Sequence, residues 1–201
     1  MRYEKGRKDE SRRRILEVAT ERFRSEGIAA SGLASIMSDA GLTNGAFYPH
    51  FKSKAELVRE SVRAALEAQS DRIGEWLASG GVEGVIAAYL SKEHRDHPEQ
   101  GCVSAALLPE LARQPPETRA VLTEDFLMLV RQVAASLPAG TPDPEGTALA
   151  IFATAIGALQ LARAVEDEAL SDQILAVGAQ AARTLTKGLT EASSESAFDR
   201  A

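Results

Sequence analysis

The sequence predicts an all-α protein, and three observations support this prediction. The chain of 201 residues is rich in Ala, Leu, Arg and Glu, which favour helices. Alternating runs of β-branched and aromatic residues, which are typical of strands, are absent. Glycine and proline divide the chain into segments of helical length. The hydrophobic content of 44% and the charged content of 26% are typical of a globular protein and exclude a wholly disordered chain.

About nine helices are expected between these breaks. The first has an apolar stripe that includes Ile15 and Phe23, and Gly27 follows it as a typical residue just beyond a helix end. The fourth begins with a capping box, in which the Ser53 hydroxyl accepts from the Glu56 amide and the glutamate reaches back. The nine expected helices span residues 11–26, 32–40, 44–50, 53–78, 81–92, 103–113, 117–136, 144–166 and 172–189.

The formal net charge of −6 is distributed unevenly along the chain. Residues 1–60 hold 12 Lys and Arg against 9 Asp and Glu, whereas residues 61–201 hold 11 against 20. A basic end on an acidic body indicates that this end meets a polyanion, although a solvated arm is the alternative. Because the charge changes near the start of the fourth helix, we predict an N-terminal three-helix domain at residues 1–52, a C-terminal helical bundle at 53–189 and a disordered tail at 190–201.

Residues 31–54 predict two short helices joined by a tight turn. Ile36 belongs to the apolar face of the first helix, and Gly41 can take the positive φ that such a turn requires. A short turn with glycine between two helices is typical of a helix-turn-helix motif, which places its second helix in the major groove of DNA. Phe47 and Phe51 are four residues apart, so we expect them to hold the second helix against the first.

The segment from Gly41 to Leu57, GLTNGAFYPHFKSKAEL, resembles the DNA-binding signature of the tetracycline-repressor (TetR/AcrR) family of bacterial regulators. Residues 14–19 and Phe23 also match the first helix of that family, and the resemblance is detailed over residues 11–60. It implies a homodimer whose two recognition helices enter successive major grooves of a palindromic operator in double-stranded DNA. The rest of the chain fits the length and helix count of the family's divergent ligand-binding and dimerisation domain.

The resemblance also implies which residues contact DNA. Family positions that match Tyr48, His50 and Lys54 contact phosphates, although Tyr48 could alternatively pack on the helix below and His50 could cap carbonyl groups. Asn44 is the best candidate for reading bases, because an amide can bond N6 and N7 of adenine together. The full expected set is Ser31, Thr43, Asn44, Gly45, Ala46, Tyr48, Pro49, His50 and Lys54.

Two further surfaces are expected in the C-terminal bundle. The last two helices hold many small residues, which allow close packing either within one chain or, as the resemblance implies, in a four-helix dimer interface. The expected interface residues are Phe152, Ile156, Leu159, Ile174, Gly178 and Leu185. The preceding helices could enclose a pocket for an unknown small-molecule effector, with plain core packing as the alternative for each residue. The expected lining is Trp76, Tyr89, Leu107, Leu111, Phe126 and Leu129.

No catalytic residues, metal site or cofactor are expected. His94, His97 and Cys102 lack the spacing of a compact tetrahedral metal site. The chain has one cysteine, no secretory signal and no run of about 20 apolar residues, so a cytoplasmic protein is expected. The sequence therefore predicts a DNA-binding transcriptional regulator, a repressor released from its operator by an effector. The alternatives are an effector-independent helical DNA-binding dimer and an all-α enzyme, for which no catalytic constellation is found.

Overall fold

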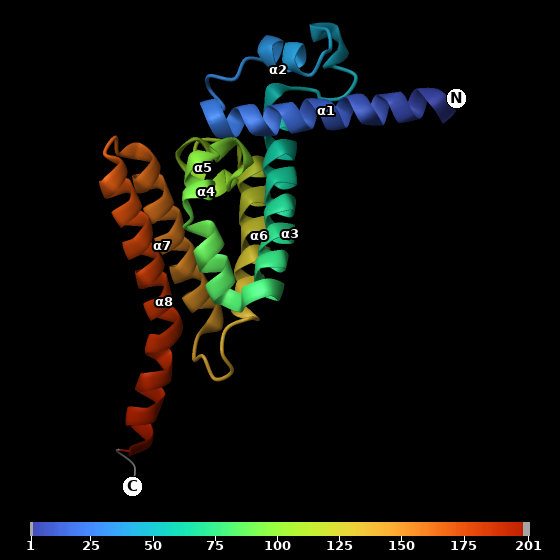
Figure 1. The fold of residues 1–201 in the computed structure, drawn as a ribbon. Helices are drawn as coiled ribbons and strands as arrows, with labels where there is room; N and C mark the ends of the chain where they lie inside the picture. Colours follow the sequence, from blue (N-terminus) through green and yellow to red (C-terminus); the bar gives the residue numbers. More distant parts are fainter. Residues whose placement is uncertain (1, 199–201) are drawn as a thin grey trace. The chain divides into compact units, whose positions relative to one another are not determined.

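The computed structural model describes the backbone of residues 2–198 and the side chains of residues 6–187. Within that part of the chain all regular structure is helical, which confirms the predicted fold class. Two short 3-10 helices, η1 and η2, accompany eight α-helices (Figure 1). The elements are α1 Arg2–Glu26, α2 Leu33–Asp39, η1 Asn44–Ala46, α3 Lys54–Tyr89, α4 Lys92–Asp96, η2 Pro98–Gln100, α5 Val103–Leu111, α6 Pro116–Ala134, α7 Pro144–Ala164 and α8 Glu168–Phe198.

The chain forms two compact units, and both include part of α3 and part of α6. Unit 1 consists of Met1–Ala68 and Pro98–Asp125, and unit 2 consists of Gln69–His97 and Phe126–Ala201. Unit 1 therefore combines α1, α2 and η1 with α5, which follows them by more than fifty residues. The predicted division at residue 53 and the predicted tail from residue 190 stay predictions. The backbone of α8 continues to Phe198, and residues 199–201 lie outside the described residues.

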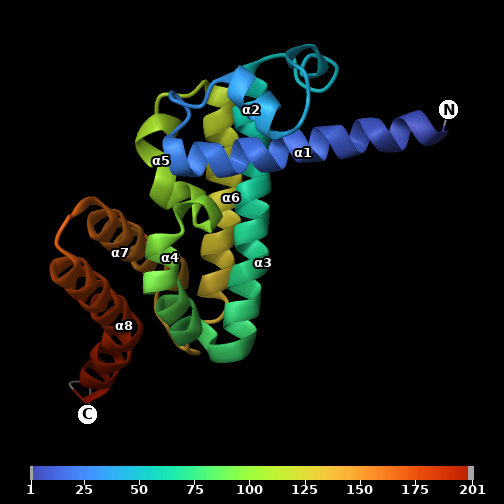
Figure 2. The ribbon, with the colours of Figure 1, turned by 45° about the horizontal axis from the view of Figure 1, so that its top comes forward.

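The core of unit 1 joins α1 to α2 and to the turn that follows. Ile15 and Phe23 of α1 and Ile36 and Met37 of α2 are all buried. In Figures 1 and 2, α2 lies beside α1. Helix α1 ends at Glu26 because Gly27 adopts a left-handed conformation with φ 88°. The predicted role of Gly27 as a helix-terminating residue is therefore confirmed.

In unit 2, α7 and α8 lie side by side along most of α7 (Figures 1 and 2). Asp143 caps α7 by accepting from the Gly146 amide at 2.9 Å. The two helices approach so closely that a Cβ atom at Gly178 would lie 2.5 Å from that of Ala158. By length and composition alone α7 could cross a membrane, but core helices of soluble proteins share these properties. Ile151 and Ala155 are among the α7 residues buried inside the unit.

Four of the six expected dimer-interface residues lie in the contact between α7 and α8 or elsewhere inside the chain, and the interface itself stays a prediction. Phe152, Ile156, Leu159 and Gly178 are all buried within the chain, so a partner cannot reach them as the chain is folded here. The contact between Gly178 and Ala158 shows that small residues also allow packing within one chain, which is the alternative that the sequence left open. Ile174 and Leu185 are half-buried and remain partly accessible on α8.

Candidate nucleic-acid interface

The helix-turn-helix segment depends on a reversal of the chain after α2. Gly41 takes φ 69° at this point, a value that strains any residue with a side chain. The amides of Gly41 and Leu42 donate to Ser38 and Met37 across the turn, each at 2.9 Å. This turn leads the chain directly from α2 into η1.

The structure corrects the predicted recognition helix. Instead of an α-helix over residues 44–50, the chain forms the 3-10 helix Asn44–Ala46 and then a turn. The Ala46 amide donates to Thr43 at 2.9 Å, and the Phe47 amide donates to Asn44 at 3.2 Å. Pro49 has no amide hydrogen and Gly45 has low helix propensity, so a regular helix cannot continue through this segment.

Two aromatic side chains anchor the segment as predicted. Phe47 and Phe51 are each 1% exposed, and their rings stack with centroids 5.6 Å apart. The Arg12 guanidinium lies 5.0 Å from the Phe51 ring centroid and pairs with Glu60 of α3 at 3.1 Å. The segment is thus fixed to α1 and α3 although only three of its residues form a helix.

The outer side of the segment holds most of the expected DNA-contacting residues. Tyr48 is 70% exposed, and its ring meets Phe47 only at an edge. Asn44 and Pro49 are exposed, and Ala46 is half-buried. Thr43 and Gly45 are exposed as well. Amide, hydroxyl and phenol groups therefore face solvent on one short segment, next to small residues that permit a close approach.

Ser31 and Lys54 are placed differently from the expectation. Ser31 is fully buried, and its hydroxyl donates to the Gly27 carbonyl at 2.7 Å, which removes it from the candidate surface. The Lys54 ammonium donates to the Ile28 carbonyl at 2.6 Å. In this structure Lys54 therefore holds the loop between α1 and α2, and a phosphate contact would require it to release that carbonyl.

The His50 imidazole is half-buried beside α1. Burial lowers the pKa of His50, and the positive charges of Lys8 and Arg12 lower it further. Its Nδ1 atom is buried and has no hydrogen-bond partner among the described residues. A neutral imidazole can still donate one hydrogen bond, but it adds no positive charge to the surface.

Glu110 is a positioning residue that sequence reasoning missed. Its carboxylate on α5 accepts from the Ile28 amide at 3.2 Å and the Ala29 amide at 2.9 Å. A Cβ atom at Gly27 would lie 2.6 Å from Glu110 Oε1. Glu110 thus binds two amides of the loop that leads into α2, and Lys54 binds one of its carbonyls. Because the bonds of Glu110 go to backbone amides about 80 residues away, the sequence carried no signal for them.

The expected effector-pocket residues are divided between the two units. Leu107 and Leu111 belong to α5 of unit 1 and are buried there. The four others belong to unit 2, and they are Trp76, Tyr89, Phe126 and Leu129. Tyr89 and Leu129 are buried. The Phe126 ring packs edge to face against the Phe152 ring, with centroids 5.4 Å apart. A common pocket for all six stays a prediction.

The two histidines and the cysteine that were considered as metal ligands each contact other parts of the protein or are buried in it. His94 is half-buried and bonds through Nδ1 to the Tyr89 carbonyl at 2.7 Å, and partial burial lowers its pKa to about 4. His97 lies 3.6 Å from the Glu93 carboxylate, and Cys102 is buried. Among residues whose side chains are described, no group of three His, Cys, Asp or Glu could hold a metal ion.

Comparison with known proteins places the sequence of the candidate interface in a family. The model of bacterial regulatory proteins of the tetR family matches residues 15–61. The chain is 43% identical to the HTH-type transcriptional regulator AcrR of Shigella flexneri over 51 residues, which is 25% of this chain and 24% of that protein. It is 36% identical to the HTH-type transcriptional repressor KstR2 of Mycobacterium tuberculosis over 62 residues, or 31% of each chain. The match thus spans less than a third of these relatives.

Solved structures extend the likeness to the whole fold. Reduced NemR of E. coli has a TM-score of 0.69 at 18% identity, over 88% of this chain and 97% of NemR. A transcriptional regulator of Rhodococcus sp. Rha1 has a TM-score of 0.71 at 18% identity, over 90% and 96% of the two chains. At this identity the likeness shows a common fold. Residues 15–61 thus resemble bacterial regulatory proteins of the tetR family, and the chain as a whole shares the fold of the two solved structures.

Proposed function

We propose that this chain is a sequence-specific DNA-binding transcriptional regulator, a repressor that leaves its palindromic operator when a small molecule binds. It acts in the cytoplasm as a homodimer, by binding rather than by catalysis. The observation that carries the proposal is the segment at residues 43–49, anchored by buried Phe47 and exposing Asn44 and Tyr48. The repressor role is supported by the similarity of this part of the chain to the transcriptional repressor KstR2.

Recognition of the DNA base sequence at this surface depends on few side chains. Asn44 offers the amide that can bond adenine at two positions, and Tyr48 offers a hydroxyl for a phosphate oxygen. Thr43, Gly45, Ala46 and Pro49 supply the surrounding contact surface. Because polar base-reading groups are scarce, the shape and deformability of the operator contribute a large share of the specificity.

Homodimer formation is supported by an apolar outer face on α8. Leu170 and Val177 are seven residues apart, lie on one face of the helix and are 45% and 60% exposed. The half-buried Ile174 and Leu185 border this face. Contact of two such faces would bury apolar surface and set the separation of two helix-turn-helix segments on the operator.

An effector site is proposed in unit 2, near Trp76, Tyr89, Phe126 and Leu129. A ligand that prefers a conformation unable to bind the operator would weaken DNA affinity by its differential affinity for the two states. The second candidate is a DNA-binding dimer without an effector. It is distinguished by a screen of small molecules in which none alters operator affinity.

The proposed function is tested by selecting duplexes from a random pool with the full chain and titrating the enriched duplex by fluorescence anisotropy. Asn44→Ala should reduce the preference for that duplex over random DNA by about tenfold, since one bidentate base contact accounts for about 1–3 kcal/mol. The matched control is Asn44→Gln, which retains an amide. Recovery of no enriched sequence, with equal affinity for all duplexes, would overturn the proposal.

A further inference from the structure

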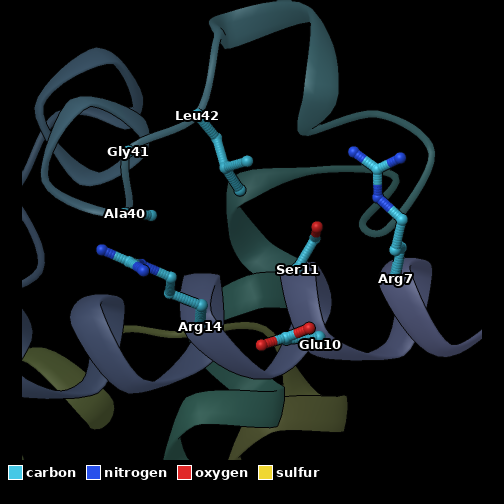
Figure 3. Close-up of a pocket in the computed structure, with 7 residues that line it drawn as sticks. All are labelled: Arg7, Glu10, Ser11, Arg14, Ala40, Gly41 and Leu42. Atoms are coloured by element: carbon cyan, nitrogen blue, oxygen red, sulfur yellow. The ribbon is translucent and has the colours of Figure 1, made fainter.

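A cavity of about 270 Å³ lies in unit 1 between the N-terminal half of α1 and the turn of the helix-turn-helix segment. Its walls come from two stretches of the chain that meet only in the folded unit. The lining residues are Arg7, Glu10, Ser11, Arg14, Ala40, Gly41 and Leu42. Figure 3 shows Arg14 directed from α1 toward the turn, Arg7 and Ser11 on the same side of α1, and Leu42 directed back toward α1.

Three of the four polar lining residues on α1 recur at the spacing of one helix face. Arg7, Ser11 and Arg14 are four and three residues apart, so their side chains line the cavity together. Both arginines are exposed. None of the three side chains has a hydrogen bond or an ion pair among the described residues. By contrast, neighbouring Arg12 pairs with Glu60 and Arg13 pairs with Glu17.

The charge of the cavity is positive. Glu10 is the one carboxylate in the lining, against two guanidinium groups. The opposite wall at Gly41 is close, because a Cβ atom there would lie 3.7 Å from Arg14 Nη2. A guanidinium group binds phosphate oxygens through paired N–H donors, and a serine hydroxyl adds a third donor at the same ligand.

We propose that this cavity binds a phosphate group, and that the group is a phosphate of the operator backbone next to the bases contacted by residues 43–49. The inference rests on the proposed function, since the cavity wall Ala40–Gly41–Leu42 leads directly into Thr43 and Asn44. A phosphate held between α1 and the turn fixes the register of the helix-turn-helix segment on the duplex without reading any base. The contact assigns Arg7 and Arg14 a role that the helix-turn-helix motif does not include.

The test compares Arg14→Gln and Arg7→Gln with the control Arg13→Gln in the full chain, on the duplex selected above. Arg13→Gln removes the same charge from a neighbouring residue that already pairs with Glu17. Arg14→Gln and Arg7→Gln should each raise the Kd about threefold to tenfold, and Arg13→Gln should change it less than twofold. Each cavity variant should also lower the slope of log K against log salt concentration by about one. Circular dichroism checks that each variant folds.

Replacing backbone phosphates one at a time by neutral methylphosphonates identifies the bound group. At one position the substitution and Arg14→Gln should not be additive, because both remove the same contact. Equal effects of Arg14→Gln, Arg7→Gln and Arg13→Gln, with wild-type binding intact, would overturn the cavity proposal and leave the proposed function standing. Failure of the wild type to prefer any duplex would overturn the proposed function itself.

A free phosphate is the other source of the same chemistry, and calorimetric titration with inorganic phosphate at constant ionic strength tests it. The operator proposal expects binding too weak to measure below millimolar concentration. Tight phosphate binding that Arg14→Gln abolishes, with the DNA affinity of Arg14→Gln equal to that of Arg13→Gln, would assign the cavity to a free anion and overturn the operator source.

Discussion

At the residue scale, charged side chains that are distant in sequence determine where the loop between α1 and α2 lies. Glu110 accepts two amides of this loop, and Lys54 donates to one of its carbonyls. Gly27 fits there because its missing side chain leaves space for the Glu110 carboxylate and because its φ is positive. The loop therefore enters α2 in a fixed direction, and the first helix of the candidate DNA-binding segment is positioned by α3 and α5.

His94 makes the stability of the protein depend on pH. Burial holds its pKa at about 4, whereas the unfolded chain has the ordinary value of 6.5, so the folded state binds the proton less tightly. The stability that the neutral imidazole contributes is complete above 6.5 and is lost as the pH falls toward 4. Between pH 7 and pH 5 the loss should be about 2 kcal/mol.

Urea unfolding of wild type, His94→Gln and His97→Gln at pH 7 and pH 5 checks this expectation. His94→Gln should lose about 2 kcal/mol less than wild type over that interval, because glutamine does not titrate. His97→Gln is the matched control because it makes the same change three residues away and leaves His94 in place, so the loss assigned to His94 should persist. An equal loss in all three proteins would show that His94 is not the group responsible.

At the element scale, the sequence predicted most helices because their apolar patterns and their breaks agree. The expected helices at 103–113 and 117–136 correspond to α5 Val103–Leu111 and α6 Pro116–Ala134. The helix expected at 44–50 was wrong because its apolar pair, Phe47 and Phe51, also fits a pair of tight turns. Pattern alone does not separate these two conformations over seven residues, and Pro49 decides between them locally.

The exposure of the expected DNA-contacting residues could be predicted in part for a related reason. Exposure of Asn44 and Tyr48 followed from the burial of Phe47 and Phe51, which the spacing indicates. The burial of Ser31 depends on a bond to a backbone carbonyl, and no side-chain pattern in the sequence records such a bond.

A change of direction inside α3 gives a prediction at this scale. Gly81 has φ 60° and ψ −153°, a region that is essentially limited to glycine, and it interrupts the helix between the expected segments 53–78 and 81–92. Gly81→Ala should therefore lower the free energy of unfolding by about 1–3 kcal/mol, although no atom blocks a Cβ there.

The adjacent glycine is a matched control for this prediction. Gly80 is helical, exposed and also open around its Cα, so Gly80→Ala should raise stability by up to about 1 kcal/mol. Chemical denaturation should show changes in the free energy of unfolding of opposite sign for the two variants if α3 is interrupted at Gly81. The same stabilisation in both would mean that α3 runs straight through Gly81.

At the scale of the whole molecule, the two units do not follow the order of the sequence. Charge and composition predict one boundary at residue 53, which stays a prediction, and in the structure α5 and the first half of α6 belong to unit 1 together with the helix-turn-helix segment. This could not be predicted from the sequence because Leu107 and Leu111 have the same apolar character as residues of the unit 2 core. Helices α3 and α6 each contribute residues to both units.

The assembly of two chains is the last prediction, and the outer face of α8 decides it. Because Phe152 and Ile156 are already buried in their own chain, we expect a partner to contact the exposed Leu170 and Val177. Val177→Lys should weaken the dimer at least about 100-fold, since it places a charge at the centre of an apolar contact. Sedimentation velocity at micromolar concentration measures the change from dimer to monomer. Met128→Lys on α6 is the control, because Met128 is 53% exposed but lies off this face. A Val177→Lys variant that stays dimeric would place the interface elsewhere on the chain.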